Sequence, residues 1–407
     1  MNTLYHHFCC GHFDPVDSRD AKPDIRRNIL KFLHTSDLHI GKKIFETSLL
    51  KEQKAMLDQI FGIAVREAVD ALVIAGDVYD RSMPAVEAVT LLDEFLTRLA
   101  EKKIPVIMIS GNHDSPERVG FADKILEKQG IYIAGTYDGT LRKVELTDAF
   151  GKVVFVCLPF VKPAVTGGTT CAEAVENILK REAIDFQDGN RYVLVTHYFV
   201  TGASGEKPQL SEAETGIDVG GIDNVPANVF EGFHYVALGH IHKAQQISGG
   251  PIYYSGAPMK YAFSEAGSSK YVNLVELDGN GEVSIIRKAV MPLHEMRCIK
   301  GELAELIRED VVNALEVDRL DYIQATLTNR EELINPIGTL RSVYPNVLQI
   351  LLEKNYHVTE ETYESKLTGE RKSTEELFAG FYRMLTGREL DERQWETVRQ
   401  AAREAEE

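Results

Sequence analysis

Residues 71–80 read Ala-Leu-Val-Ile-Ala-Gly-Asp-Val-Tyr-Asp. The first five side chains are apolar, and the run is too short for a helix, which is typical of a strand buried on both faces. Gly76 follows directly, and a glycine lets the chain turn sharply out of a strand. The sequence therefore predicts that Asp77 and Asp80 lie just beyond the carboxyl end of a buried strand.

Four other short apolar runs end in the same way, on residues that can bind a metal ion. They are 31–36 before Asp37, 104–110 before Asn112 and His113, 192–196 before His197, and 235–239 before His240. Apolar stripes with helical spacing occupy residues 50–69 and 86–99. Strands alternating with helices indicate an α/β layered core, in which ligands bind beyond the carboxyl ends of the strands.

The chemistry rests on five motifs, which are Asp37-Leu38-His39, Gly76 to Asp80, Gly111-Asn112-His113-Asp114, Thr196-His197 and Gly239-His240-Ile241-His242. One such motif alone is more often a helix cap or a satisfied core pair. Together they supply carboxylates, an amide oxygen and imidazoles, which suit Mn, Fe or Zn better than Mg alone. The donors are too many for one ion. A shared carboxylate between two ions about 3.5–4 Å apart is an arrangement known for phosphate-ester hydrolysis.

Composition narrows the class of protein. The 407 residues suggest two to three domains, and 62 acidic against 45 basic residues give a net charge of −17. That charge argues against a basic nucleic-acid coat protein but not against a nuclease, because bound metal ions reverse the local field. Five cysteines form no disulfide framework, and the start shows no signal peptide. No apolar run approaches the ~20 residues of a membrane span. We therefore expect a cytoplasmic protein with no membrane partner.

We expect five segments along the chain. Residues 1–30 form an extension, disordered or non-native, because its histidines and cysteines fit no standard zinc spacing. Residues 31–290 form the α/β core. Residues 291–352 form a small α+β domain with strands at 296–300, 322–327 and 347–352 and helices at 303–314 and 334–343. Residues 353–374 are a linker, and residues 375–407 form two helices with apolar stripes.

The five motifs resemble those of the calcineurin-like metallophosphoesterase superfamily. More narrowly, residues 37–42, 235–242 and 254–265 resemble the SbcD family of nuclease subunits, although Ala257 stands where that family usually has Ser. The resemblance runs from about Lys31 to the end of the chain. It implies a layered two-sheet core with helices outside, then an α+β capping domain and a C-terminal helical pair.

The resemblance also implies roles for the site residues. The first metal ion would be held by Asp37, His39, Asp77 and His242. The second would be held by Asp77, Asn112, His197 and His240. His113 would face the scissile phosphate and stabilise or protonate the leaving oxygen. Our hypothesis is that Asp80 orients His113 through a hydrogen bond, with Asp114 as the competing candidate.

The function implied is that of a DNA nuclease with two divalent ions, Mn²⁺ being favoured. It would act on duplex ends, hairpins and single strands. The implied partner is SbcC, an SMC-like ATPase of DNA repair and recombination, in a heterotetramer or larger assembly with two nuclease subunits. The chain has no P-loop of its own, which agrees with an ATPase partner. The tail residues Phe378, Phe381, Tyr382 and Trp395 would grip that partner's coiled coil or pack back on this chain.

Other readings stay open at this point. A small-molecule phosphodiesterase or phosphatase would share the metal centre but would need neither capping domain nor tail helices. A non-enzymatic scaffold would have no need of seven metal ligands and His113. The basic residues Lys42, Lys43 and Arg81, and the basic segment 287–300, either contact DNA phosphates or face water.

Overall fold

The computed structural model describes residues 29–210, 223–314, 318–329, 331, 333–353, 374–386 and 388–406. Most of the predicted extension and of the predicted linker lie outside these residues. The chain forms two compact units, Met1–Leu351 and Leu352–Glu407, which are treated separately below. Within the described residues, no helix has the length and apolar character needed to cross a membrane.

The first sheet contains six strands in the order β16-β15-β1-β4-β5-β6. Their bounds are Val283–Val290, Lys270–Leu277, Leu30–Thr35, Ala71–Ala75, Val106–Ile109 and Ile131–Ala134. The run β1-β4-β5-β6 is parallel, whereas β15 and β16 are antiparallel to their neighbours. The strands expected before Asp37, Asp77 and Asn112 therefore end at the same edge.

The second sheet also has six strands, in the order β13-β14-β12-β9-β8-β7. Their bounds are Gln245–Ile247, Ile252–Tyr254, Tyr235–Gly239, Arg191–His197, Gly151–Leu158 and Arg142–Asp148. The strands β14, β12, β9 and β8 are parallel. Strands β9 and β12 end at His197 and immediately before His240.

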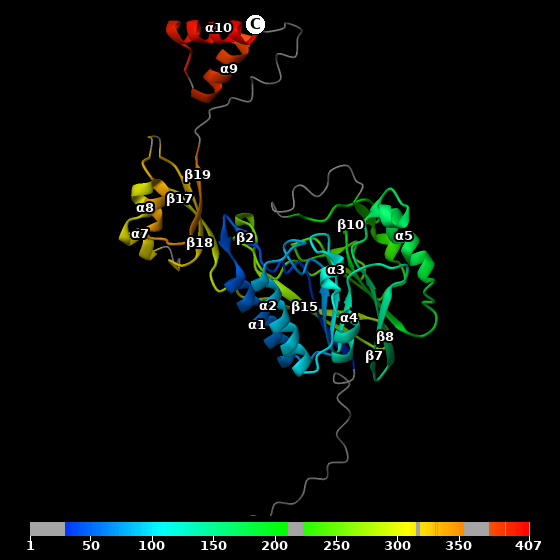
Figure 1. Cartoon of the computed structure of the whole chain (residues 1–407). Helices are drawn as coiled ribbons and strands as arrows, with labels where there is room; N and C mark the ends of the chain where they lie inside the picture. The colour runs from blue at the N-terminus through cyan, green and yellow to red at the C-terminus, as the bar shows by residue number, and fades with distance from the viewer. Residues whose placement is uncertain are drawn as a thin grey trace, which may run out of the picture. The chain divides into compact units, whose positions relative to one another are not determined.

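The two sheets pack face to face, and helices cover their outer faces (Figure 1). Between the sheets the ring of Phe32 meets those of Phe155 and Tyr235 edge to face, with centroids 5.2 and 5.6 Å away. Helices α1 (Leu50–Arg66) and α2 (Val86–Glu101) cover the first sheet, and α5 (Cys171–Glu182) covers the second. The expected α/β core of two layered sheets is confirmed.

Shorter elements connect these layers. They are the hairpin β2 (Lys43–Ile44) and β3 (Thr47–Ser48), the helices α3 (Pro116–Val119) and α4 (Asp123–Leu126), and the strand pair β10 (Phe199–Thr201) and β11 (Asn224–Pro226).

A third sheet, in the order β17-β18-β19, lies after the core. Its strands span Met296–Gly301, Tyr322–Leu327 and Val347–Leu352, and α8 spans Pro336–Arg341. The single helix expected at 303–314 is wrong, because the structure has α6 (Leu303–Leu306) and α7 (Glu309–Ala314) instead. The break allows Leu306 and Val312 to enter the same apolar cluster. We refer to residues 296–352 as the capping sheet and its helices.

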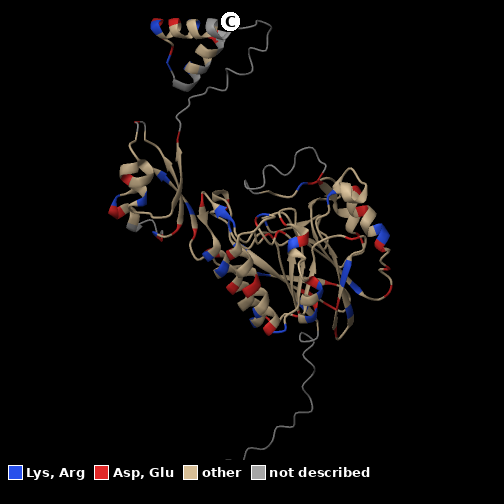
Figure 2. Cartoon of the chain, in the orientation of Figure 1, with Lys and Arg blue, Asp and Glu red and all other residues tan. Residues whose placement is uncertain are grey.

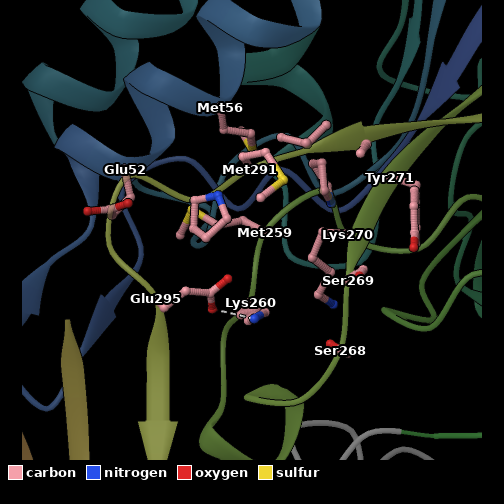
Figure 3. A pocket seen from close by; sticks show the side chains of 14 residues that line it. Glu52, Met56, Met259, Lys260, Ser268, Ser269, Lys270, Tyr271, Met291 and Glu295 are labelled. Atoms are coloured by element: carbon pink, nitrogen blue, oxygen red, sulfur yellow. Dashed lines mark hydrogen bonds and ion pairs between the residues drawn. The ribbon is translucent and has the colours of Figure 1, made fainter. Parts of the chain in front are cut away.

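The capping sheet is tied to α1 at a small cavity of about 110 Å³ (Figure 3). Buried Glu52 of α1 accepts hydrogen bonds from the backbone N–H groups of Leu293 and His294 at 3.0 and 3.2 Å. The ring of His294 lies 2.6 Å from the same carboxylate. Lys260 pairs with Glu295 across the cavity at 2.5 Å. Since hydrogen bonds to charged groups are the stronger kind, these contacts fix where the capping sheet begins.

The second unit consists of α9 (Thr374–Thr386) and α10 (Glu392–Glu406). Asp391 and Gln394 cap α10 reciprocally, each side chain accepting a hydrogen bond from the other residue's backbone N–H. The ring of Phe378 is 46% exposed, while the side chain of Phe381 lies outside the described residues.

The packing between the sheets generates a prediction. Replacing Phe155, which is fully buried, by Ala should destabilise the first unit by about 3–5 kcal/mol, because a cavity replaces the ring. Differential scanning calorimetry would show a lowered Tm. Phe121 is 79% exposed, and Phe121→Ala serves as the control that leaves the Tm in place. Equal Tm values for both variants would contradict this account of the core.

Candidate metal centre

The predicted site residues meet at the common edge of the two sheets. Asp37 follows β1, Asp77 follows β4, and Asn112 and His113 follow β5 of the first sheet. His197 ends β9, while His240 and His242 follow β12 of the second sheet. Sheet-to-sheet packing therefore brings together residues from distant parts of the sequence.

The carboxylate of Asp77 lies at the centre of the cluster. Its Oδ2 atom is 3.4 Å from Nε2 of His197, 3.8 Å from Nε2 of His39 and 4.0 Å from Nε2 of His113. Its Oδ1 atom accepts a hydrogen bond from the backbone N–H of His113 at 2.9 Å. This one carboxylate thus faces imidazoles from three different strand ends.

Two further groups of donor atoms flank Asp77. On one side, Nε2 of His39 lies 3.1 Å from Nε2 of His242, and Asp37 belongs to the same potential metal-binding group. On the other side, Oδ1 of Asn112 is 3.0 Å from both Nε2 of His197 and Nδ1 of His240. The structure therefore brings together all seven predicted ligand residues. Asp77 lies at the centre, with three of the other ligand residues on each side of it.

Hydrogen bonding at His197 tests whether these residues suit a cation. Its Nδ1–H donates to the carbonyl of Ala75 at 2.8 Å, so Nε2 of the neutral ring carries a lone pair. That lone pair faces the oxygens of Asn112 and Asp77, and such groups repel unless a proton or cation lies between them. Atoms that bind one ion at about 2.1 Å lie roughly 3.0–3.4 Å apart in octahedral or tetrahedral geometry. The spacing found here fits divalent metal ions.

Backbone strain is concentrated at the same residues. Asp37, His39, Asp77 and His240 have φ values of 53°, 42°, 48° and 98°, in the left-handed region that side chains usually avoid. Each such residue costs about 1–3 kcal/mol and persists where the surrounding structure enforces it. The glycine at Gly76 is also required, since its φ is 87° and an added Cβ would lie 2.4 Å from Nδ1 of His197.

Burial and mutual charge shift the protonation of the cluster. Burial raises the pKa of Asp37 to about 7, and it lowers the pKa of His39 to about 4 and of His240 to about 3. Burial opposes protonation of His197 too, but the Asp77 carboxylate outweighs it and raises the pKa of His197 to about 9. The same interaction holds the pKa of Asp77 well below its usual range. Without metal, a proton on His197 therefore occupies the place of a cation at neutral pH.

The structure shows which atom of Asp80 contacts His113. The ring of His113 does contact Asp80, but Nδ1–H donates to its backbone carbonyl at 3.1 Å, not to its carboxylate. The carboxylate points away because it pairs with Lys42 at 2.7 Å, and it lies 3.9 Å from Nδ1 of His39. The competing candidate, Asp114, is buried and accepts hydrogen bonds from the backbone N–H groups of Val78, Tyr79 and Gly111.

His113 differs from the other imidazoles in its access to solvent. Its side chain is 44% exposed, and the bond to the Asp80 carbonyl turns Nε2 toward Asp77. It also forms a potential metal-binding group with His39 and Asp77. An exposed imidazole at the rim can reach a substrate phosphate, which the buried imidazoles cannot.

Sequence reasoning missed several residues that support the cluster. Buried Ser36 donates to Asp37 at 2.5 Å and contacts Ser255 at 2.8 Å. Gln53 of α1 donates to the carbonyl of His39 at 2.7 Å. The ring of Tyr261 lies edge-on to those of His39 and His242, with centroids 5.4 and 5.7 Å away. Tyr261 lies within the 254–265 stretch of the resemblance, but nothing in its spacing indicated this contact.

The predicted cationic residues have different surroundings. Lys288 pairs with Glu67 at 2.8 Å and Arg297 with Asp321 at 2.5 Å, so neither charge is available without rearrangement. Arg81 is 80% exposed and lies 3.5 Å from Asp80. Burial raises the pKa of the Cys157 and Cys171 thiols to about 12, which makes them unsuited to nucleophilic chemistry.

Comparison with known proteins adds independent information. The sequence model of the calcineurin-like phosphoesterase family matches residues 30–244, and that of the type 5 capsule protein repressor C-terminal domain matches residues 292–386. The SbcD component of the nuclease SbcCD from Staphylococcus epidermidis is 29% identical over 378 residues, which cover 91% of this chain and 97% of the relative. The resemblance to the SbcD family is thereby confirmed.

Two solved structures are also similar. TT1561 of Thermus thermophilus has 12% identity and a TM-score of 0.37, covering 64% of this chain and 99% of its own. A dimetal phosphatase from Danio rerio has 13% identity and a TM-score of 0.38, covering 65% of this chain and 98% of its own.

The match to the calcineurin-like phosphoesterase model alone spans more than half of the 407 residues. This chain therefore belongs to the calcineurin-like phosphoesterase family.

Proposed function

We propose that this chain is a metal-dependent DNA nuclease that acts with the ATPase SbcC. The observation that carries the proposal is the cluster of seven donor residues with Asp77 at its centre, and His113 exposed at its rim. The named relative, a nuclease component matched along almost its whole length, supports DNA as the substrate. The match at residues 292–386 supports a capping domain, which a small-molecule phosphodiesterase would not need.

In this proposal Asp77 would be the shared ligand of two divalent ions. Asp37, His39 and His242 would complete the first site, and Asn112, His197 and His240 would complete the second. Mn²⁺ is the favoured ion because the donor set mixes imidazoles with carboxylates and an amide oxygen. When bound, such a pair of divalent ions would polarise the phosphate and lower the pKa of a coordinated water. The chain's own part is to hold these donors in place, which the hydrogen bonds to Asp37, Asp77 and His197 accomplish.

His113 acts on the substrate directly. The Asp80 carbonyl fixes Nδ1 as the protonated nitrogen, so Nε2 is the atom that faces the reacting phosphate. In its protonated form this nitrogen donates a proton to the leaving oxygen, and in either form it orients the phosphate. The carboxylate of Asp80 acts elsewhere in this account, holding Lys42 at the rim of the site and lying beside His39.

The partner and the assembly are part of the same proposal. The exposed Phe378 of α9 gives the helical pair an apolar contact for the coiled coil of SbcC. Two nuclease subunits would join two ATPase subunits in a heterotetramer or larger complex. Duplex ends, hairpins and single strands are the expected substrates.

The raised pKa of His197 generates a prediction for metal binding. Because Mn²⁺ must displace the proton that His197 holds below about pH 9, its affinity should rise about tenfold per pH unit between pH 7 and 9. Calorimetric titration of the full chain in two buffers of different ionisation enthalpy would detect release of about one proton per chain.

The control for this measurement is His197→Asn, which removes the titrating group. Its affinity should be weaker and should rise less steeply between pH 7 and 9 than that of the wild type, because only Asp37, whose pKa burial raises to about 7, still titrates there. A wild-type affinity that is flat over this range, with no dependence of the heat on the buffer, would contradict the assignment.

The second prediction concerns His113. His113→Ala should slow cleavage of a DNA hairpin with a single-stranded tail by about 10²–10⁴-fold, while the bound Mn²⁺ stays at the wild-type level. Cleavage assays with and without SbcC, together with metal analysis of the purified variant, would measure both quantities.

Asp80→Asn provides the matched comparison, because the carbonyl that meets His113 remains. Adding His113→Ala to Asp80→Asn should slow the reaction by the same factor as in the wild type. A much smaller factor would mean that the Asp80 side chain acts through His113 after all.

Hydrolysis of bis-p-nitrophenyl phosphate without any DNA cleavage, even with SbcC present, would favour the small-molecule phosphoesterase instead.

A further inference from the structure

The β2–β3 hairpin displays an aromatic ring at a strained position. Its two central residues, Phe45 and Glu46, have φ values of 46° and 67°. Two left-handed residues between paired strands form the type I′ pattern, for which Asn-Gly is the preferred sequence. A bulky side chain with positive φ is an outlier. Phe45 is also 53% exposed, so neither backbone preference nor burial explains an aromatic residue here.

Phe45 lines a groove of about 520 Å³ between the metal-bearing core and the capping sheet. One wall is the hairpin from Lys42 to Phe45, and a second is the segment 261–264. The third is the capping sheet, through Cys298 of β17, Gln324 of β18 and Gln349 of β19. This volume lies within the range of about 300–1,000 Å³ that ligand sites occupy.

The groove lies next to the candidate metal centre, to which Lys42 and Tyr261 connect it. Nζ of Lys42 pairs with Asp80 and lies 5.5 Å from the centroid of the Tyr261 ring. Tyr261 in turn contacts the rings of His39 and His242 edge-on. A phosphate bound beside these imidazoles therefore has its neighbouring nucleotide at the mouth of the groove.

The charge of the groove is opposite to that of the chain. Its charged lining residues are Lys42 and Lys43, and no carboxylate lies among the described residues that line it, although the net charge of the chain is −17. Asp80, next to the groove, pairs with Lys42, so exposed Lys43 contributes most of the positive charge. Figure 2 shows how Lys and Arg (blue) and Asp and Glu (red) are distributed along the chain. A cationic groove in an acidic protein attracts a phosphate backbone.

Polar groups line the far wall. Nε2 of Gln324 donates to Oε1 of Gln349 at 2.6 Å. Each amide has further donor and acceptor capacity, which suits the polar edge of a nucleobase. The ring of Phe263 faces that of Phe45 with centroids 6.3 Å apart and an angle of 29° between planes.

We propose that this groove is a nucleotide subsite that takes one unpaired base next to the scissile phosphate. The base stacks on Phe45, its phosphate lies against Lys43, and its edge faces the Gln324–Gln349 pair. The inference rests on the proposed nuclease function and adds to it a contact with the base. Stacking on an aromatic ring tolerates any base, so the subsite would select unpaired ends and loops rather than a sequence.

The test is a scan with 2-aminopurine, whose fluorescence is quenched when it stacks. Single-stranded oligonucleotides with the probe at successive positions would be bound to the full chain with Mn²⁺, in a His113→Ala background that prevents cleavage. We expect one position to be strongly quenched. Phe45→Asn should abolish that quenching and weaken binding by about five- to a hundredfold, whereas Phe45→Tyr should retain both.

Misfolding would not explain such a result, because Asn is the residue a type I′ turn favours. The Tm of Phe45→Asn should therefore equal or exceed that of the parent. Phe121→Asn, at an exposed ring that does not line the groove, is the matched control with parental binding. A second readout is alkylation of the exposed Cys298 by iodoacetamide, which bound oligonucleotide should slow.

Two results would overturn the inference. If DNA is bound and cleaved but Phe45→Asn matches the parent in quenching and affinity, the groove is not a base subsite, and the nuclease function stands. If the wild-type chain binds no DNA even with SbcC, the proposed function fails and the subsite fails with it.

Discussion

The architecture of this chain depends on one electrostatic constraint, the crowding of electron-pair donors around the Asp77 carboxylate. Lone pairs of imidazole, amide and carboxylate groups face one another at 3.0–4.0 Å from five strand ends. Such a cluster is stable only with positive charge inside it. Without metal, a proton on His197, whose pKa the Asp77 carboxylate raises to about 9, supplies part of that charge. Divalent ions would supply it fully.

The rest of the core enforces this arrangement. Two sheets with parallel central strands aim their carboxyl ends at the same edge, and the rings packed between the sheets fix their separation. Four site residues in the left-handed region show that the fold stabilises local conformations that the backbone disfavours. The helices α1 and α2 contribute apolar packing, and Gln53 and Glu52 of α1 connect the same helix to His39 and to the capping sheet. Phe45, near the edge of the site, also has a φ value in the left-handed region that the backbone disfavours.

Much of this could be predicted from the sequence, because short apolar runs that end on Asp, Asn or His mark strand ends directly. The α/β class, helices α1 and α2 and the meeting of Asp, Asn and His side chains at one edge follow from that pattern, whereas the choice of seven ligands came from the family resemblance. The contact of Asp80 with His113 could not be assigned to the right atom, since spacing does not distinguish a carboxylate from a backbone carbonyl. The hairpin β7–β8 and helix α5 carry none of these motifs, and the sequence pattern did not predict them. The groove at Phe45 depends on the packing of the capping sheet, which no local pattern encodes.

The most direct measurement is a crystal structure of the full chain grown with Mn²⁺, with anomalous diffraction recorded at the manganese edge. The account predicts two anomalous peaks about 3.5–4 Å apart, with the Asp77 carboxylate bound to both. A single peak, or two peaks of which Asp77 touches only one, would contradict the central claim that this carboxylate is shared.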